Sequence, residues 1–215
     1  MNAVSVAAEP SDAATLLAAT SRHFYFDTTF QRRAVKILPG EFHVTTDDTL
    51  LVTVLGSCVA ACIRDRVRGI GGMNHFMLPA RKDAGVLSAS MRYGAYAMEM
   101  LINQLYRAGA RREQLEIKVF GGAAVLPGMS TIDVGERNSR FVLDYLREEG
   151  LGVAAQDLGD IHPRKVYFSP ASGDIMVRRL RASALPEDLA REASYARQLD
   201  NTASRPATGG GLQLF

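Results

Sequence analysis

Apolar and polar positions along this chain follow two periods, one typical of strands and one typical of helices. TLLVTVLG at 49–56 is a continuous apolar run of β-branched and leucine residues, as expected of a strand buried on both faces. VAACIRD at 59–65 and GIGGMNHFMLP at 69–79 are shorter apolar pieces, and a hairpin through RVR is their simplest connection. AVKILPGEFHVTT at 34–46 alternates around a Pro-Gly break, which predicts a strand, a turn and a strand.

Two later segments have helical spacing. In SASMRYGAYAMEMLINQLYRAGA at 88–110, apolar residues recur every three or four positions, and the same holds for GERNSRFVLDYLREEG at 135–150. LEIKVFGGAAV predicts a strand running into glycines, and LGVAAQDLG with RKVYFSPASGDIMVRRL predicts three more, the last two joined as a hairpin. We therefore predict an α/β fold, a single-domain mixed β-sheet sandwich covered by helices.

The two ends differ in composition from the middle. Residues 1–24, rich in small residues, are predicted to be a mobile N-terminal segment, and 25–182 the folded domain. Residues 183–215 are predicted to be a tail that is helical through PEDLAREASYARQLD and then disordered through NTASRPATGGGLQLF.

Composition and charge exclude several classes of function. The 215 residues are 47% apolar and carry a formal net charge of +2, without a long basic block interleaved with aromatics, so nucleic acid is not an expected partner. No apolar run reaches the roughly 18–20 residues needed to cross a bilayer, so membrane insertion is not expected. The N-terminus lacks the features of a secretory signal, which favours a cytoplasmic location.

The candidate chemistry lies at the end of the apolar run, where Cys58 follows Gly56 and Ser57. A thiol attacks a carbonyl as thiolate, and free cysteine has a pKa of about 8.5, so a neighbouring base must take the proton. His75 is the best-placed candidate, because the hairpin would bring it back beside the strand that Cys58 opens. The Gly-Ser turn also offers backbone N–H groups to a developing oxyanion. Thr53, a hydroxyl within the apolar run, is a candidate to orient the imidazole.

Each of these residues also has a structural interpretation, which is favoured when the residue is taken alone. A buried cysteine is usually a small hydrophobe, His75 could be a hydrogen-bonded core histidine, and Thr53 could be chosen for β-branching. In a strand, Cys58 and Cys62 would lie about 13 Å apart, beyond disulfide reach. We therefore assign Cys62 to the core, and we predict no metal site and no cofactor.

The sequence does not decide the role of two glycine-containing motifs. Gly121 and Gly122 could be mistaken for a phosphate cradle, but no GxGxxG or GxxxxGK[ST] pattern is present, so close packing or a site-lining loop is favoured. In VGERN, Arg137 and Asn138 could belong to a helix entry or to a site.

Five segments together resemble the CheD family of chemoreceptor glutamine deamidases. They are LVTVLGSCVAACIRD, GIGGMNHFMLP, SMRYGAYAMEMLIN, KVFGGAAV and VGERN, in this order between about Ala34 and Leu180. The resemblance implies a fold similar to the deamidating domain of cytotoxic necrotizing factor toxins. It also implies a cysteine hydrolase that converts selected glutamines of methyl-accepting chemotaxis receptors to glutamate.

The resemblance assigns roles to residues by motif. Cys58 matches the nucleophile and His75 the base, in agreement with the reasoning from the residues, and Thr53 is the candidate third member. Candidates for holding the oxyanion or lining the substrate site are Gly56, Ser57, Asn74, Gly121 and Gly122.

Other functions stay open at this level. Receptor methylesterase activity would use the same electrophilic carbon. A regulatory binding module for a CheC-type phosphatase is the main alternative, which the Cys58–His75 pair disfavours in its purely non-catalytic form. An unrelated cysteine amidase acting on small molecules would need a closed pocket.

Overall fold

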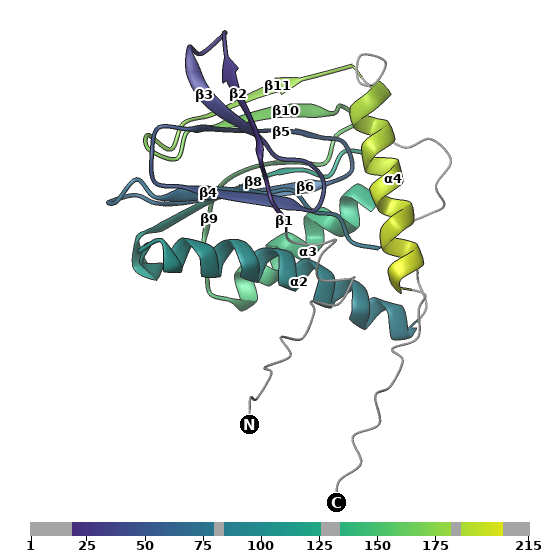
Figure 1. Cartoon of the computed structure of the whole chain (residues 1–215). Coiled ribbons are helices and arrows are strands. Elements are labelled where there is room, and N and C mark those ends of the chain that lie inside the picture. Colours follow the sequence, from purple (N-terminus) through teal and green to yellow (C-terminus); the bar gives the residue numbers. More distant parts are fainter. Residues whose placement is uncertain (1–18, 80–83, 126–133, 182–185, 204–215) are drawn as a thin grey trace, which may run out of the picture.

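Two mixed β-sheets packed face to face form the centre of the protein, with helices on one outer face and at one end (Figure 1). The computed structural model describes residues 19–79, 84–125, 134–181 and 186–203, and the structural statements below concern these residues. Helices α2 and α3 cover one sheet, and α4 lies along one end of the sandwich (Figure 1).

The first sheet has six strands in the order β1-β4-β7-β6-β8-β9. Its strands are β1 (Ala19–Thr20), β4 (Glu41–Thr45), β7 (Gly71–Asn74), β6 (Val59–Asp65), β8 (Leu115–Gly121) and β9 (Val153–Leu158). The pairs β1–β4 and β8–β9 are parallel and the others antiparallel.

The second sheet has five strands in the order β11-β10-β5-β3-β2. These are β11 (Ile175–Arg179), β10 (Arg164–Phe168), β5 (Leu50–Leu55), β3 (Arg32–Lys36) and β2 (His23–Asp27). Strands β3 and β5 are parallel and the other pairs antiparallel.

The helices are α2 (Ala84–Arg107), α3 (Val134–Glu148) and α4 (Pro186–Ala203), with a 3₁₀ turn η1 at Arg112–Gln114. Helix α2 ends before Gly109, whose φ of 101° is accessible to glycine at little cost. Among the described helices, none is long and apolar enough to cross a membrane.

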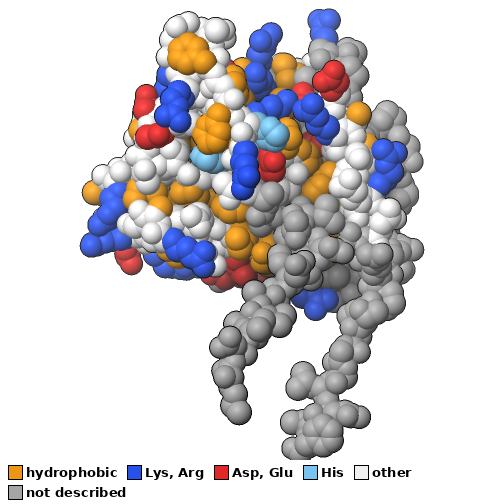
Figure 2. Space-filling view, in the orientation of Figure 1, with side chains coloured by type: hydrophobic (Ala, Val, Ile, Leu, Met, Phe, Trp, Pro, Cys, Tyr) orange, Lys and Arg blue, Asp and Glu red, His pale blue; other side chains and the backbone are white. Residues whose placement is uncertain are grey.

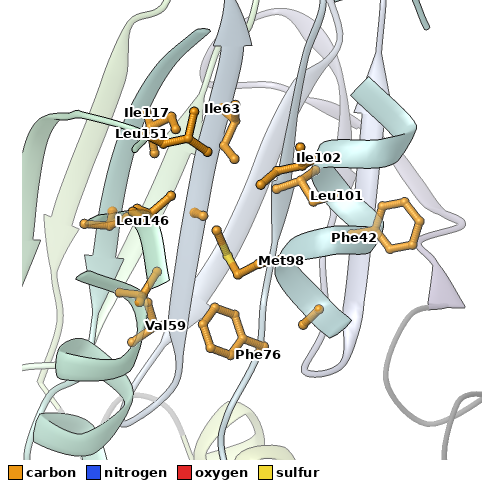
Figure 3. Packing of buried hydrophobic residues seen from close by; sticks show 14 of the residues in the cluster. Phe42, Val59, Ile63, Phe76, Met98, Leu101, Ile102, Ile117, Leu146 and Leu151 are labelled. Carbon is orange, nitrogen blue, oxygen red and sulfur yellow. The ribbon is translucent and has the colours of Figure 1, made fainter. Parts of the chain in front are cut away.

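Strand β6 separates two apolar layers because its side chains alternate between the faces of its sheet. Val59, Ala61 and Ile63 belong to the cluster beneath α2 and α3, which Figure 3 shows at close range. Ala60 and Cys62 point the other way, into the layer between the sheets, and Cys58 just before the strand shares that side. The thiol therefore faces the second sheet and not the helical layer.

Most of the predicted elements are confirmed. The run at 49–56 is β5, the helices at 88–110 and 135–150 are α2 and α3, and 59–79 forms the β6–β7 hairpin. The last two strands pair antiparallel as predicted. The two strands around the Pro-Gly break lie in different sheets, because the turn at Gly40 carries the chain from one sheet to the other.

Packing extends beyond the range 25–182 at both ends. Strand β1 pairs with β4, and β2 begins within the segment expected to be mobile. Helix α4 buries Tyr195 and Leu199 in the layer between the sheets. Backbone pairing through 19–24 and apolar burial through 186–203 thus extend the fold beyond that range. Residues 1–18, predicted to be mobile, and 204–215, predicted to be disordered, lie outside the described residues.

The surface of the described residues is mixed in character. Figure 2 shows Lys and Arg side chains spread over one face with apolar side chains between them. Phe24 and Phe26 are more than half exposed on β2, an edge strand of the five-stranded sheet.

Leu101 tests the layer beneath α2. Its side chain is fully buried in that cluster, so Leu101→Ala is expected to lower the free energy of unfolding by about 2–5 kcal/mol. Met91→Ala on the same helix, at a side chain that is 43% exposed, should change it by less than about 0.5 kcal/mol. Urea unfolding measures both, and equal effects would contradict this account of the core.

Candidate active site

Two backbone hydrogen bonds bring Cys58 and His75 together. The N–H of Val59 donates to the carbonyl of Phe76 at 2.9 Å, and the N–H of Phe76 donates back to Val59 at 2.9 Å. This bridge keeps the antiparallel register of β6 and β7 past Asn74. In that register Cys58 and His75 lie diagonally across the bridge and on the same face, so their side chains are within reach of each other. The predicted juxtaposition of Cys58 with His75 is confirmed.

A third residue, Glu192 of α4, completes a buried cluster. The Cys58 sulfur, a ring nitrogen of His75 and a carboxylate oxygen of Glu192 all lie within 4.8 Å of one another. All three side chains are almost completely inaccessible to solvent. Because Glu192 belongs to α4, which lies along one end of the sandwich (Figure 1), this cluster joins that helix to the β6–β7 hairpin.

Thr53 holds one edge of the imidazole from the opposite sheet. Its Oγ1 lies 2.8 Å from His75 Nδ1 and 2.8 Å from the carbonyl oxygen of Ile37. The carbonyl can only accept, so the hydroxyl donates to Ile37 and accepts from Nδ1–H. This arrangement leaves the proton on Nδ1 and a lone pair on Nε2.

The Nε2 atom of His75 faces the cluster without a hydrogen bond. It is buried, has no hydrogen-bond partner among the described residues, and lies 3.8 Å from a Glu192 oxygen. Burial is the main cause that lowers the pKa of His75 to about 4. The ring is therefore neutral at pH 7 and can accept a proton at Nε2.

The Gly-Ser turn presents donors to the same point. The N–H of Gly56 donates to Oε1 of Glu192 at 2.7 Å, and the N–H of Ser57 donates to Oε2 at 3.0 Å. The hydroxyl of Ser57 also donates to Oε2, at 3.2 Å. Burial, reinforced by the Glu192 charge, raises the pKa of the Cys58 thiol. Burial also raises the pKa of Glu192, and the hydrogen bonds from Gly56 and Ser57 oppose that rise. The cluster thus holds a neutral thiol beside the Glu192 carboxyl group.

Asn138 locks this turn to the segment that carries His75. Its Nδ2 donates to the carbonyl of Ser57 at 2.8 Å, and its Oδ1 accepts from the N–H of Leu78 at 2.9 Å. The side chain is fully buried. The open question about VGERN is therefore answered in part, since Asn138 lies against the Cys58 turn and positions it.

Gly121 and Gly122 pack against the backbone of Cys58. The N–H of Gly122 donates to the carbonyl of Cys58 at 2.8 Å. Gly121 has a φ of 114°, and a Cβ there would lie 2.2 Å from the same carbonyl oxygen. Their observed contact is with the main chain of the cysteine.

Asn74 lies on the opposite face of the sheet from His75. Its Oδ1 accepts from the N–H of Ala61 at 2.9 Å, and its Nδ2 donates to the carbonyl of Ala97 in α2 at 3.1 Å. The structure does not bring its amide together with Cys58. Its visible role is to tie β6 to the helical layer.

The second cysteine does not take part in this cluster. Cys62 is a free thiol buried in the core, and burial raises its pKa. Cys58, His75 and Glu192 do offer the sulfur, nitrogen and oxygen atoms that zinc binds. Both Glu192 oxygens, however, already accept hydrogen bonds from Gly56 and Ser57.

Glu192 is the residue of this cluster that sequence reasoning missed. The signal for it is a carboxylate within the apolar stripe of α4, between Leu189 and Tyr195. Helical periodicity reveals that such a residue faces inward, but not what it meets.

Comparison with known proteins identifies the family. A family model described as CheD chemotactic sensory transduction matches residues 77–179. A protein of Ralstonia nicotianae named probable chemoreceptor glutamine deamidase CheD is 66% identical over 92% of this chain and 84% of its own length. A protein of the same name from Thiobacillus denitrificans is 60% identical over 90% of this chain and 95% of its own.

One solved structure gives only a weak match. The crystal structure of Bacillus licheniformis hypothetical protein YfiH aligns with a TM-score of 0.31 and 13% identity, over 56% of this chain and 49% of that one. This match carries no argument about the fold, and the expected likeness to cytotoxic necrotizing factor toxins is not confirmed by it. The sequence relatives do decide the family: the chain belongs to the CheD family.

Proposed function

We propose that this protein deamidates glutamine side chains of methyl-accepting chemotaxis receptors, with Cys58 as nucleophile and His75 as base. The observation that carries the proposal is the buried pair itself, in which a neutral imidazole with a free Nε2 lies beside a thiol. The relatives are named chemoreceptor glutamine deamidases, which supports the substrate and a cytoplasmic site of action.

The first half of the reaction forms a thioester. His75 Nε2 takes the thiol proton, and the Cys58 sulfur forms a bond to the glutamine carboxamide carbon. The N–H and hydroxyl of Ser57 hold the oxyanion, and Asn138 keeps Ser57 in place through its carbonyl. Protonated His75 then gives the proton to the amide nitrogen, the C–N bond breaks, and ammonia leaves.

The second half restores the enzyme. Water attacks the thioester carbon while His75 takes one of its protons, and the S–C bond breaks to leave a glutamate side chain. The proton returns from His75 to the Cys58 sulfur. The sum is one glutamine and one water converted to one glutamate and one ammonia. Each turnover adds a negative charge to a receptor helix, which changes the electrostatics between neighbouring helices.

Three finer proposals follow from the same family. A γ-glutamyl methyl ester presents the same carbon with a better leaving group, so we propose methylesterase activity at the same cysteine. Binding of a CheC-type phosphatase is proposed from the resemblance. The fold relation to the cytotoxic necrotizing factor deamidating domain is proposed on the same ground.

A mass measurement on a receptor fragment tests the proposed function. A purified receptor cytoplasmic fragment incubated with the wild-type protein should gain about one dalton at particular glutamines. The gain should be absent with Cys58→Ala and with His75→Ala, because the nucleophile or its base is then missing. Cys62→Ala is the matched control and should retain activity, since Cys62 lies in the core. Activity that survives Cys58→Ala would overturn the proposal.

Thr53 is expected to act by positioning His75. Thr53→Val keeps the shape but removes the hydroxyl between Nδ1 and Ile37, so kcat should fall roughly ten-fold, the factor that corresponds to a hydrogen bond of about 1.4 kcal/mol. Thr53→Ser should restore most of it. If both variants have wild-type kcat, Thr53 does not orient the base.

The neutral, buried His75 predicts a specific dependence of stability on pH. The pKa of His75 in the folded protein, about 4, lies below its ordinary value of 6.5. The stability that the neutral ring contributes to the folded protein is therefore fully present above pH 6.5 and is lost as the pH falls toward 4. Between pH 7.5 and pH 5 the free energy of unfolding of the wild type should fall by about 2 kcal/mol more than that of His75→Gln. Urea unfolding at the two pH values measures this difference. Identical losses would mean that His75 titrates normally in the folded protein.

A further inference from the structure

Helix α4 presents a mostly apolar stripe to the end of the sandwich, with a carboxylate in its middle. Tyr195, Ala196 and Leu199 are buried in the layer that also contains Cys58. One turn earlier, Glu192 is only 2% exposed. An ionised side chain at such a position is costly unless its partners are built for it.

The partners of Glu192 are the groups to which we assign the chemistry. Its Oε2 accepts from the N–H and the hydroxyl of Ser57, and its Oε1 accepts from the N–H of Gly56. Oε1 also lies 3.8 Å from His75 Nε2. In the proposed reaction, Oε2 therefore stands at the oxyanion position, and Oε1 stands where the amine leaves and water enters.

The shape of the Gly-Ser turn fits this side chain. A Cβ added to Gly56 would lie 2.7 Å from Oε2 of Glu192 and 3.1 Å from a methyl carbon of Leu189. Because Gly56 has no side chain, Glu192 and Leu189 of α4 can occupy this space. An ion pair at 3.0 Å between Lys36 of β3 and Asp188 ties the first turn of α4 to the second sheet.

Glu192 is not placed as the acid of a catalytic triad. Such an acid holds the imidazole nitrogen remote from the nucleophile, and here Thr53 and Ile37 occupy that nitrogen. Glu192 lies instead on the Nε2 side, where it competes with substrate. With α4 in place the Cys58 side chain has no solvent exposure, and burial together with the carboxylate raises the pKa of its thiol.

We propose that α4 occupies the substrate site of this enzyme as an internal product mimic, with Glu192 seated where the glutamate made from a receptor glutamine lies. The inference rests on the proposed function and deepens it. The substrate it implies is a helical segment that presents one glutamine within an apolar stripe, as α4 presents Glu192. The N–H of Gly56 favours a carboxylate oxygen over an amide nitrogen at the Oε1 position, which stabilises the closed state until a receptor helix displaces α4.

The sharpest test turns the mimic of the product into a substrate. In full-length Glu192→Gln, Cys58 should deamidate residue 192, so that this position is recovered as glutamate in nearly every chain. Glu192→Gln combined with Cys58→Ala should keep glutamine there. Cleavage before aspartate gives a peptide spanning 188–199, in which exposed Gln198 is an internal control that should stay glutamine.

The outcome separates two failures. If Glu192→Gln is folded and deamidates the receptor fragment but keeps glutamine at 192, the product-mimic proposal is wrong and the proposed function stands. If the wild-type protein also leaves the receptor fragment unchanged, the function itself fails.

Removal of the carboxylate provides an independent test. Glu192→Ala should raise kcat/KM on the receptor fragment by at least about three-fold, mainly through a lower KM, because more molecules then have an open site. Glu187→Ala on the exposed side of α4 is the matched control and should leave kcat/KM unchanged. A fall in kcat for Glu192→Ala would instead make Glu192 part of the catalytic machinery and overturn the inference.

Discussion

The reciprocal hydrogen bonds between Val59 and Phe76 are the contact on which the rest of the site depends. They keep the antiparallel register of the β6–β7 hairpin past Asn74, so that Cys58 and His75 lie diagonally across the bridge on the same face. The thiol of Cys58 and the imidazole of His75 are thereby held by main-chain pairing, which a side-chain substitution does not readily disturb. The remaining polar groups refine a juxtaposition that the hairpin has already made.

The polar side chains around Cys58 and His75 come from the five-stranded sheet and from helices α3 and α4. Thr53 reaches the imidazole from the five-stranded sheet and determines which nitrogen keeps its proton. Asn138 of α3 hydrogen-bonds both to the carbonyl of Ser57 and to the N–H of Leu78. Glu192 of α4 fills the space that these groups enclose. Each polar side chain is buried and each has partners, so a small relative shift of the layers would leave several of them unsatisfied.

The sequence predicts the local part of this arrangement. Strand β5, the β6–β7 hairpin and both long helices follow from periodicity, and the hairpin alone brings His75 to Cys58. The passage of the chain between sheets at Gly40 could not be predicted, because a strand alternates in the same way whichever sheet it joins. Glu192 was missed for a related reason. Its position within the stripe of α4 reveals burial, but the partner surface is formed by residues far away in the chain.

The central claim is that Cys58, with its proton removed by His75, attacks a glutamine carboxamide. Its most direct test is a receptor peptide in which a diazoketone analogue replaces the target glutamine, incubated with the full-length protein and followed by peptide mapping. The account predicts one label per chain, on Cys58, with activity lost in proportion, and much slower labelling in His75→Ala. A label on another residue, or loss of activity with Cys58 unmodified, would contradict it.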